Sequence, residues 1–252
     1  GSAGYFNKDG AEYENEHGKD QPTYNLRAVI APMAEAGNVL HFGINYANRD
    51  VEDFNGSVTS RMGVRGTTED TTNGNRPTFA PGVTGQFDGD SAWGLEAAYA
   101  VGPFSVQSEY LKRNMSGFRT NGDREATGYN MQFAYTLTGE SRIYKLDGAK
   151  FDAIKPSNKQ TGAWEVFYRY ENLNVQDDDI MATVGGVAID ETEAKVHTLG
   201  VNWYVNEAVK VSANYLMTST DDDTVKLQTG RFAAGDDDDS GNAISLRAQY
   251  VF

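Results

Sequence analysis

The chain ends on the stretch Ala243-Ile244-Ser245-Leu246-Arg247-Ala248-Gln249-Tyr250-Val251-Phe252. Apolar side chains occupy every second position, and Ser245, Arg247 and Gln249 lie between them. A period of two predicts a β-strand with one apolar and one polar face. An unpaired edge strand invites association, whereas the last strand of a closed barrel pairs with the first. We therefore favour a barrel over the alternative, an ordinary amphipathic strand.

The composition is compatible with a membrane barrel. Hydrophobic residues make up 39% of the 252 residues, and the mean hydropathy is −0.57, as in many water-soluble proteins. A membrane barrel has a similar average, because lipid-facing and lumen-facing residues alternate. No run approaches the roughly 20 apolar residues of a membrane helix. The 14 Tyr, 12 Phe and 27 Gly suit strands and turns.

Several functions are disfavoured by what the sequence lacks. Without cysteine there are no disulfides and no Cys-based zinc sites. The histidines His17, His41 and His197 suggest no ligand cluster, so we expect no metal and no cofactor. The net charge of −14 argues against nucleic-acid binding. The first residues lack the features of a signal peptide, so we expect a mature or partial chain.

Alternating segments recur along the whole chain and predict about twelve antiparallel strands. They lie at residues 23–31, 40–47, 57–66, 92–101, 104–113, 127–137, 162–173, 195–204, 209–217 and 243–252. Residues 2–8 look like the tail of a further strand, and 76–81 is weakly patterned, since its two prolines limit it to an irregular strand. Short turns alternate with long polar loops, as in outer-membrane barrels with periplasmic turns and external loops. With a periplasmic C-terminus, the turns at 32–38, 102–103 and 206–208 and the basic link 139–160 all become periplasmic, provided that 76–81 counts as a strand. We predict an all-β transmembrane antiparallel barrel, with residues 1–252 as a single domain.

Basic residues lie on the polar, inward-facing side of these strands. They are Arg27, Arg61, Arg65, Arg169, Lys210 and Arg247. Arg61 and Arg65 would stand roughly 13 Å apart on one strand face. Guanidinium groups suit phosphate because they donate two hydrogen bonds and keep their charge. The alternative is that these side chains merely pair with lumen carboxylates, namely Glu96, Glu109, Glu165 and Glu171.

Three acidic runs fall in the predicted external loops. They are Asp177–Asp179, Asp221–Asp223 and Asp236–Asp239. Solvated loops are the simpler interpretation. The alternative is binding of divalent cations that bridge lipopolysaccharide, although the spacing is not that of a calcium loop.

Several stretches resemble the phosphate-selective porin O and P family. They are 94–99, 102–104, 144–151, 153–156, 162–170, 197–204, 206–211 and the ending Gln249-Tyr250-Val251-Phe252. The terminal phenylalanine also resembles the last strand of bacterial outer-membrane barrels. This resemblance implies a sixteen-stranded, homotrimeric barrel of the bacterial outer membrane through which phosphate-type anions diffuse passively. Twelve strands are fewer than sixteen, so we expect either the C-terminal part of such a porin or a smaller closed barrel.

The resemblance also implies roles for basic residues. Arg61 and Arg65 lie where the family carries part of an arginine ladder. The residues Lys145, Lys150, Lys155 and Lys210 fit a periplasmic basic region, and Arg142 lies in the same basic link.

These features together predict an outer-membrane porin for phosphate or polyphosphate. We expect contacts with outer-membrane lipid and lipopolysaccharide. A general or cation-preferring porin is one alternative, and a plugged structural or receptor barrel is another. We expect no enzymatic activity, because no nucleophile–base pair is apparent.

Overall fold

The structure, a computed structural model, describes residues 1–8, 21–63, 77–229 and 239–250. Ten strands form one large sheet: β1 (Ser2–Lys8), β2 (Gln21–Glu35), β3 (Asn38–Phe54), β6 (Phe87–Val101), β7 (Phe104–Gly117), β8 (Arg124–Thr136), β11 (Ala163–Asp177), β14 (Glu191–Tyr204), β15 (Val209–Thr220) and β16 (Asp239–Tyr250). The remaining elements are short: β4 (Val58–Thr59), β5 (Thr78–Ala80), β9 (Tyr144–Lys145), β10 (Lys150–Phe151), β12 (Ala182–Val184), β13 (Val187–Ile189) and helix α1 (Asp222–Thr229).

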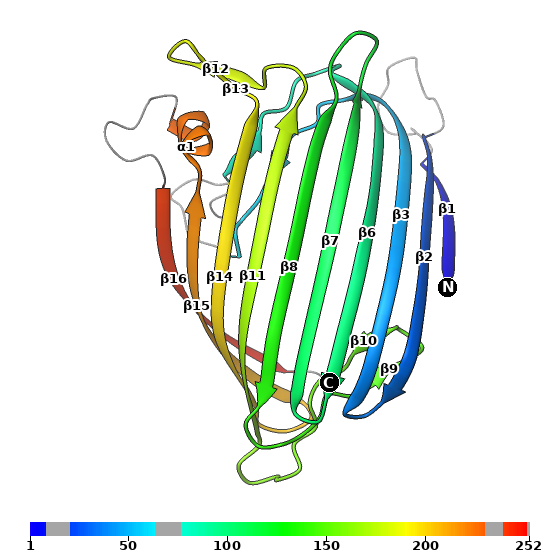
Figure 1. Ribbon diagram of the computed structural model, residues 1–252, viewed down its shortest axis with the longest axis vertical. Coiled ribbons are helices and arrows are strands. Elements are labelled where there is room, and N and C mark those ends of the chain that lie inside the picture. Colours follow the sequence, from blue (N-terminus) through cyan, green and yellow to red (C-terminus); the bar gives the residue numbers. More distant parts are fainter. Residues whose placement is uncertain (9–20, 64–76, 230–238, 251–252) are drawn as a thin grey trace.

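The large sheet is antiparallel throughout and strongly curved (Figure 1). Its strands follow one another in chain order, so each wall strand pairs with the wall strands before and after it in the sequence. Among the described residues, β1 pairs only with β2, and β16 pairs only with β15. The sheet therefore forms a curved wall with a convex and a concave face. The all-β antiparallel prediction is confirmed.

The convex face is apolar and exposed, as lipid contact requires. Large hydrophobic side chains on it include Leu26, Ile44, Leu95, Met131, Phe133, Leu199, Ile244 and Leu246. Cross-strand register keeps them on one side: Leu26 lies opposite Tyr46, and Ile44 opposite Leu95. Their neighbours along each strand are polar or small and, by alternation, point to the concave face. The inward and outward faces therefore match those predicted from alternation.

Short and long connections are segregated to opposite ends of the wall (Figure 1). The β2–β3, β6–β7 and β14–β15 turns lie at one end together with the 139–160 link. The β12–β13 hairpin and α1 lie at the other end. The first turn is tighter than expected, because β2 continues to Glu35 and a bulge between Ile30 and Met33 accommodates Pro32. Within the described residues, no helix is long and apolar enough to cross a membrane.

The predictions of wall strands at 57–66 and 76–81 are wrong. Of the residues in these ranges that the structure describes, only Val58–Thr59 and Thr78–Ala80 form strands, and they pair with each other outside the large sheet. The strand β4 ends at Thr59, and positive φ angles at Met62 (49°) and Gly63 (77°) take the following residues away from an extended conformation. The wall therefore has ten strands and not twelve. Because two consecutive predicted strands are absent from it, β3 still pairs antiparallel with the next wall strand, β6.

Residues 55–63 and 77–86 fold against the concave face instead. Phe79 and Ala80 are fully buried in a cluster with Val175 of β11 and Ala194 of β14. At the opposite end of the wall, Tyr144 of β9 packs with Val39 and Ala100. The residues around Phe79 at one end and the link around Tyr144 at the other end therefore fill part of the hollow.

Charge should be tolerated on one face of β8 and not on the other. We expect Met131→Arg, on the exposed convex face, to cost about 2–4 kcal/mol of unfolding free energy in lipid. Its neighbour Asn130 lies on the concave face opposite Glu109 and Glu171, so Asn130→Arg should change stability by less than about 1 kcal/mol. Urea unfolding in lipid vesicles measures both. Equal costs would contradict the assignment of faces.

Candidate pore lining

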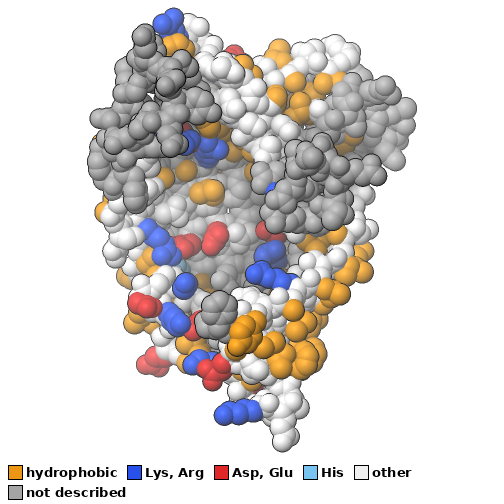
Figure 2. All heavy atoms as spheres, turned by 180° about the vertical axis from the view of Figure 1, so that it is seen from behind, with side chains coloured by type: hydrophobic (Ala, Val, Ile, Leu, Met, Phe, Trp, Pro, Cys, Tyr) orange, Lys and Arg blue, Asp and Glu red, His pale blue; other side chains and the backbone are white. Residues whose placement is uncertain are grey.

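Charged side chains of both signs gather on the hollow side of the wall. Figure 2 shows lysine, arginine, aspartate and glutamate side chains over this face, with hydrophobic side chains toward its edge. Strand alternation places the charges there, because each apolar convex position has polar neighbours that point inward. The concave face is therefore the candidate lining of a water-filled path.

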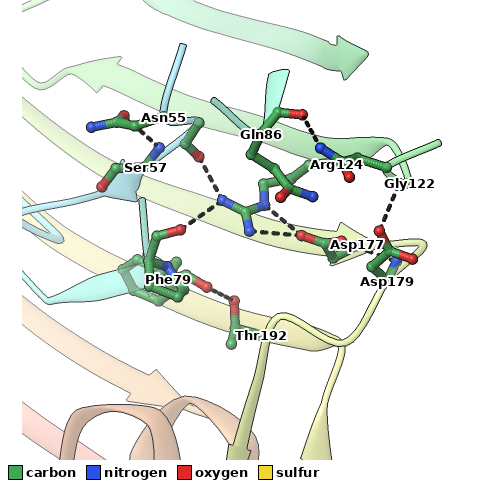
Figure 3. Close-up of polar contacts among 12 residues, drawn as sticks. Asn55, Ser57, Phe79, Gln86, Gly122, Arg124, Asp177, Asp179 and Thr192 are labelled. Atoms are coloured by element: carbon green, nitrogen blue, oxygen red, sulfur yellow. Dashed lines mark hydrogen bonds and ion pairs between the residues drawn. The ribbon is translucent and has the colours of Figure 1, made fainter. Parts of the chain in front are cut away.

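One buried ion pair holds the 55–63 and 77–86 segments to the wall (Figure 3). Arg124 and Asp177 have side chains only 2% exposed, and Arg124 Nε donates to Asp177 Oδ2 at 2.7 Å. Arg124 Nη1 donates to the carbonyl oxygens of Gly56 at 2.8 Å and Pro81 at 2.9 Å. The Thr192 hydroxyl donates to the Phe79 carbonyl at 2.7 Å. These contacts fix residues 55–63 and 77–86, together called the inward-folded segment, at the long-loop end of the wall.

The β9–β10 link is held at the other end by a second polar group. Tyr144 Oη lies 2.5 Å from Nδ1 of the buried His41. Nearby, Arg27 makes a two-pronged contact with Glu96, with Nε–Oε1 2.8 Å and Nη2–Oε2 3.0 Å. Arg27 also donates to the Ala149 carbonyl of the link at 3.4 Å. Arg27 thus joins three parts of the chain that are distant in sequence.

A third network surrounds the fully buried Glu165. Arg142 Nη2 lies 2.5 Å from Glu165 Oε2, while Asn202 Nδ2 donates to Oε1 at 2.8 Å. The Tyr204 hydroxyl donates to the same oxygen at 3.3 Å, and Lys210 Nζ lies 5.0 Å from the Tyr204 ring centre. Arg142, Tyr204 and Lys210 also line a cavity of about 270 Å³ at this end. The buried carboxylate therefore anchors Arg142 to the wall.

Glu140 clamps the start of the link outside the strands. Its carboxylate accepts hydrogen bonds from Ser157 N at 2.9 Å, from Ser157 Oγ at 2.7 Å and from the Thr138 hydroxyl. Burial raises the pKa of Glu140, but these hydrogen bonds outweigh it and lower the pKa to about 2. The clamp therefore depends on an ionised carboxylate.

The predicted basic residues occupy different settings. Arg27, Arg169, Lys210 and Arg247 lie on the concave face of wall strands; Arg169 forms an ion pair with Glu171 at 3.0 Å. Arg61 lies beyond β4 in the inward-folded residues 55–63, and so not on a strand of the large sheet. Arg65 lies outside the described residues. In the link, Lys145 pairs with Asp152 at 2.8 Å and Lys155 with Glu207 at 3.5 Å, while Lys150 is exposed.

Sequence reasoning missed two further arginines on the concave face, Arg49 and Arg113. Arg113 Nε and Nη2 donate to Asp90 at 2.7 and 3.0 Å, and Arg49 Nη2 donates to Asp90 at 2.8 Å. Extending the alternation of 40–47 by two residues would have placed Arg49 inward. Within 104–113, alternation with Phe104, Val106 and Tyr110 already predicts that Arg113 points inward. The described residues contain no group of three His, Asp or Glu able to hold a metal.

A family profile described as "Phosphate-selective porin O and P" matches residues 2–252. The chain belongs to the phosphate-selective porin O and P family. Porins of this family are channels of the bacterial outer membrane. Porin O of Pseudomonas aeruginosa is 48% identical over 263 residues, an alignment that covers 100% of this chain and 57% of that protein. The chain thus spans little more than half the length of this curated relative.

Two solved structures of an outer-membrane protein of Vibrio cholerae are also similar to this chain. In-vitro folded OmpT has a TM-score of 0.45 and 12% identity, over 92% of this chain and 63% of OmpT. An OmpT loop L8 deletion mutant has a TM-score of 0.48 and 11% identity, over 98% of this chain and 74% of that one.

Breaking the Arg124–Asp177 pair should release the inward-folded segment. Arg124→Met leaves a buried carboxylate without its cation, which costs about 3–5 kcal/mol of unfolding free energy. The double variant Arg124→Met/Asp177→Asn should cost less. Lys112→Met is the control, because Lys112 pairs with Glu125 at a more exposed site, and should cost under about 1 kcal/mol. Urea unfolding and limited proteolysis at 55–63 measure this; equal losses in the control would contradict it.

The Glu140 clamp should make stability depend on pH. A lowered carboxyl pKa stabilises the fold fully above the ordinary value of 4.5, and this contribution is lost as pH falls toward about 2. Glu140→Gln should therefore cost about 1–2 kcal/mol at pH 7, after allowance for solvent screening, and progressively less from pH 4.5 to pH 2. Denaturant unfolding of both forms at several pH values measures the difference. A difference independent of pH would refute the clamp.

Proposed function

We propose that this chain forms part of the wall of an outer-membrane pore through which phosphate-type anions diffuse passively. The observation that carries this proposal is the family match over 2–252, together with 48% identity to Porin O. The apolar convex face fits lipid contact, and the charged concave face fits a water-filled path. The end with short turns is then periplasmic.

Basic side chains would attract anions at successive depths of the pore. Arg49 and Arg113 lie toward the long-loop end, Arg169 lies near the middle of β11, and Arg142 and Lys210 lie near the short-turn end. Rows of arginine and lysine are the expected lining of an anion pore. The inward-folded segment carrying Arg61 narrows the path. Phosphate would exchange part of its hydration for guanidinium contacts.

Two alternatives rest on specific contacts. Glu96, Glu165 and Glu171 neutralise inner arginines, which supports a general or cation-preferring porin. The chain around Phe79 and the link around Tyr144 both fold against the concave face, which supports a plugged structural or receptor barrel. A homotrimer, contacts with lipopolysaccharide and the absence of catalysis belong to the same proposal, by analogy with the family.

Single-channel recording in planar bilayers under a KCl gradient tests the anion pore. We expect a reversal potential on the anion side and a current that phosphate reduces. A cation-side potential would favour the first alternative, and a folded protein without current would favour the second.

The role of Arg61 and Arg65 can be tested in the same recordings. Arg61→Glu/Arg65→Glu should move the reversal potential toward cations, because the two substitutions change the charge of this stretch of sequence by four units. Arg119→Glu changes an exposed residue at a loop tip and should leave the potential close to that of the wild type. If the double variant keeps the wild-type anion preference, the two arginines do not contribute to selectivity.

A further inference from the structure

Asp90 is shared by two arginines on the concave face. Arg113 binds both carboxylate oxygens, and Arg49 shares Oδ2 with Arg113. The ring of Phe54 lies 5.3 Å from the Arg49 guanidinium carbon and 5.1 Å from that of Arg113. The aromatic ring and the carboxylate together hold two guanidinium groups side by side. One negative and two positive charges leave this cluster with a net charge of +1.

Another arginine–aspartate pair in the wall, Arg124–Asp177, differs from the Asp90 cluster in its burial. Arg124 and Asp177 are both 2% exposed, as in a structural latch. In the Asp90 cluster, the arginine side chains keep 42% and 31% of their surface exposed, while Asp90 keeps 13%. The guanidinium groups therefore face the hollow, and the carboxylate lies behind them. Each guanidinium has five N–H donors, and Asp90 takes one from Arg49 and two from Arg113.

We propose that Asp90 is a specificity-determining residue that weakens anion binding to the Arg49–Arg113 pair so that phosphate can leave it. This inference rests on the proposed pore function. Two adjacent guanidinium groups match a phosphate group closely. A pore needs binding that is favourable enough for entry and weak enough for release. The fixed carboxylate repels a bound anion at short range, while its hydrogen bonds keep both guanidinium groups in place.

The test compares the wild type with Asp90→Asn, which removes the charge at nearly constant size. Glu125→Gln is the matched control, since it removes a carboxylate paired with Lys112 on the convex face. We expect Asp90→Asn to lower the phosphate concentration that halves the chloride current by about fivefold, comparable to the loss of one exposed ion-pair interaction. Its reversal potential should shift toward anions. Glu125→Gln should change neither quantity.

If Asp90→Asn folds poorly, a second pair of variants that changes and then restores the net charge of the cluster still tests the proposal. Arg49→Gln leaves Arg113 and Asp90 as a neutral pair, so its reversal potential should shift toward cations. The double variant Asp90→Asn/Arg49→Gln restores the net charge of +1 and should return close to the wild-type potential. Migration of the unheated protein in SDS gels reports folding of each variant.

The outcomes separate this inference from the proposed pore. If the wild type conducts anions and is blocked by phosphate, but Asp90→Asn behaves like Glu125→Gln, the role of Asp90 is refuted and the pore stands. If the wild type prefers cations, the anion preference is refuted, while a shift confined to Asp90→Asn still supports a counter-charge at this site. If the folded wild type carries no current, both proposals fail.

Discussion

A sheet that borders lipid must satisfy every backbone group within itself and expose only apolar side chains on one face. The eight inner strands of the sheet approach this constraint through antiparallel pairing on both sides and an alternation of side chains that is interrupted at bulges, while β1 and β16 pair on one side among the described residues. Alternation then dictates the other face, because each apolar position has inward-pointing neighbours. The charged lining is a direct consequence of lipid contact on the opposite side.

A single-layer wall has little hydrophobic core of its own. Its buried clusters form where connecting segments return to the concave face, around Phe79 at one end and Tyr144 at the other. Both segments are also held by polar contacts, since a returning loop must satisfy its backbone groups. The segments that fill part of the hollow are thus the ones that give the wall its buried contacts.

Burial separates the structural ion pairs from those that face the hollow. Arg124 and Asp177 are removed from water, so their main effect is to hold the returning segment. Arg49 and Arg113 share Asp90 but remain partly exposed, so their charge extends into the hollow on the concave side. Arg27 is intermediate, because it pairs with Glu96 and also reaches the link at Ala149. An inward arginine therefore cannot be assigned a role from its strand position alone.

The sequence by itself determined most of the wall: ten of the twelve predicted strands form it, with the inner and outer faces that alternation predicts and with the short turns at one end. It also carried the family resemblance. Only the tertiary structure decided the course of 55–63 and 77–86, where β4 and β5 pair with each other outside the large sheet. It likewise decided the partners of the inner arginines. Arg27 and Glu96 are 69 residues apart, and Arg124 and Asp177 are 53 apart. Alternation is a local property of the backbone, whereas ion pairing depends on distances that arise only when the sheet curves and the loops fold into it.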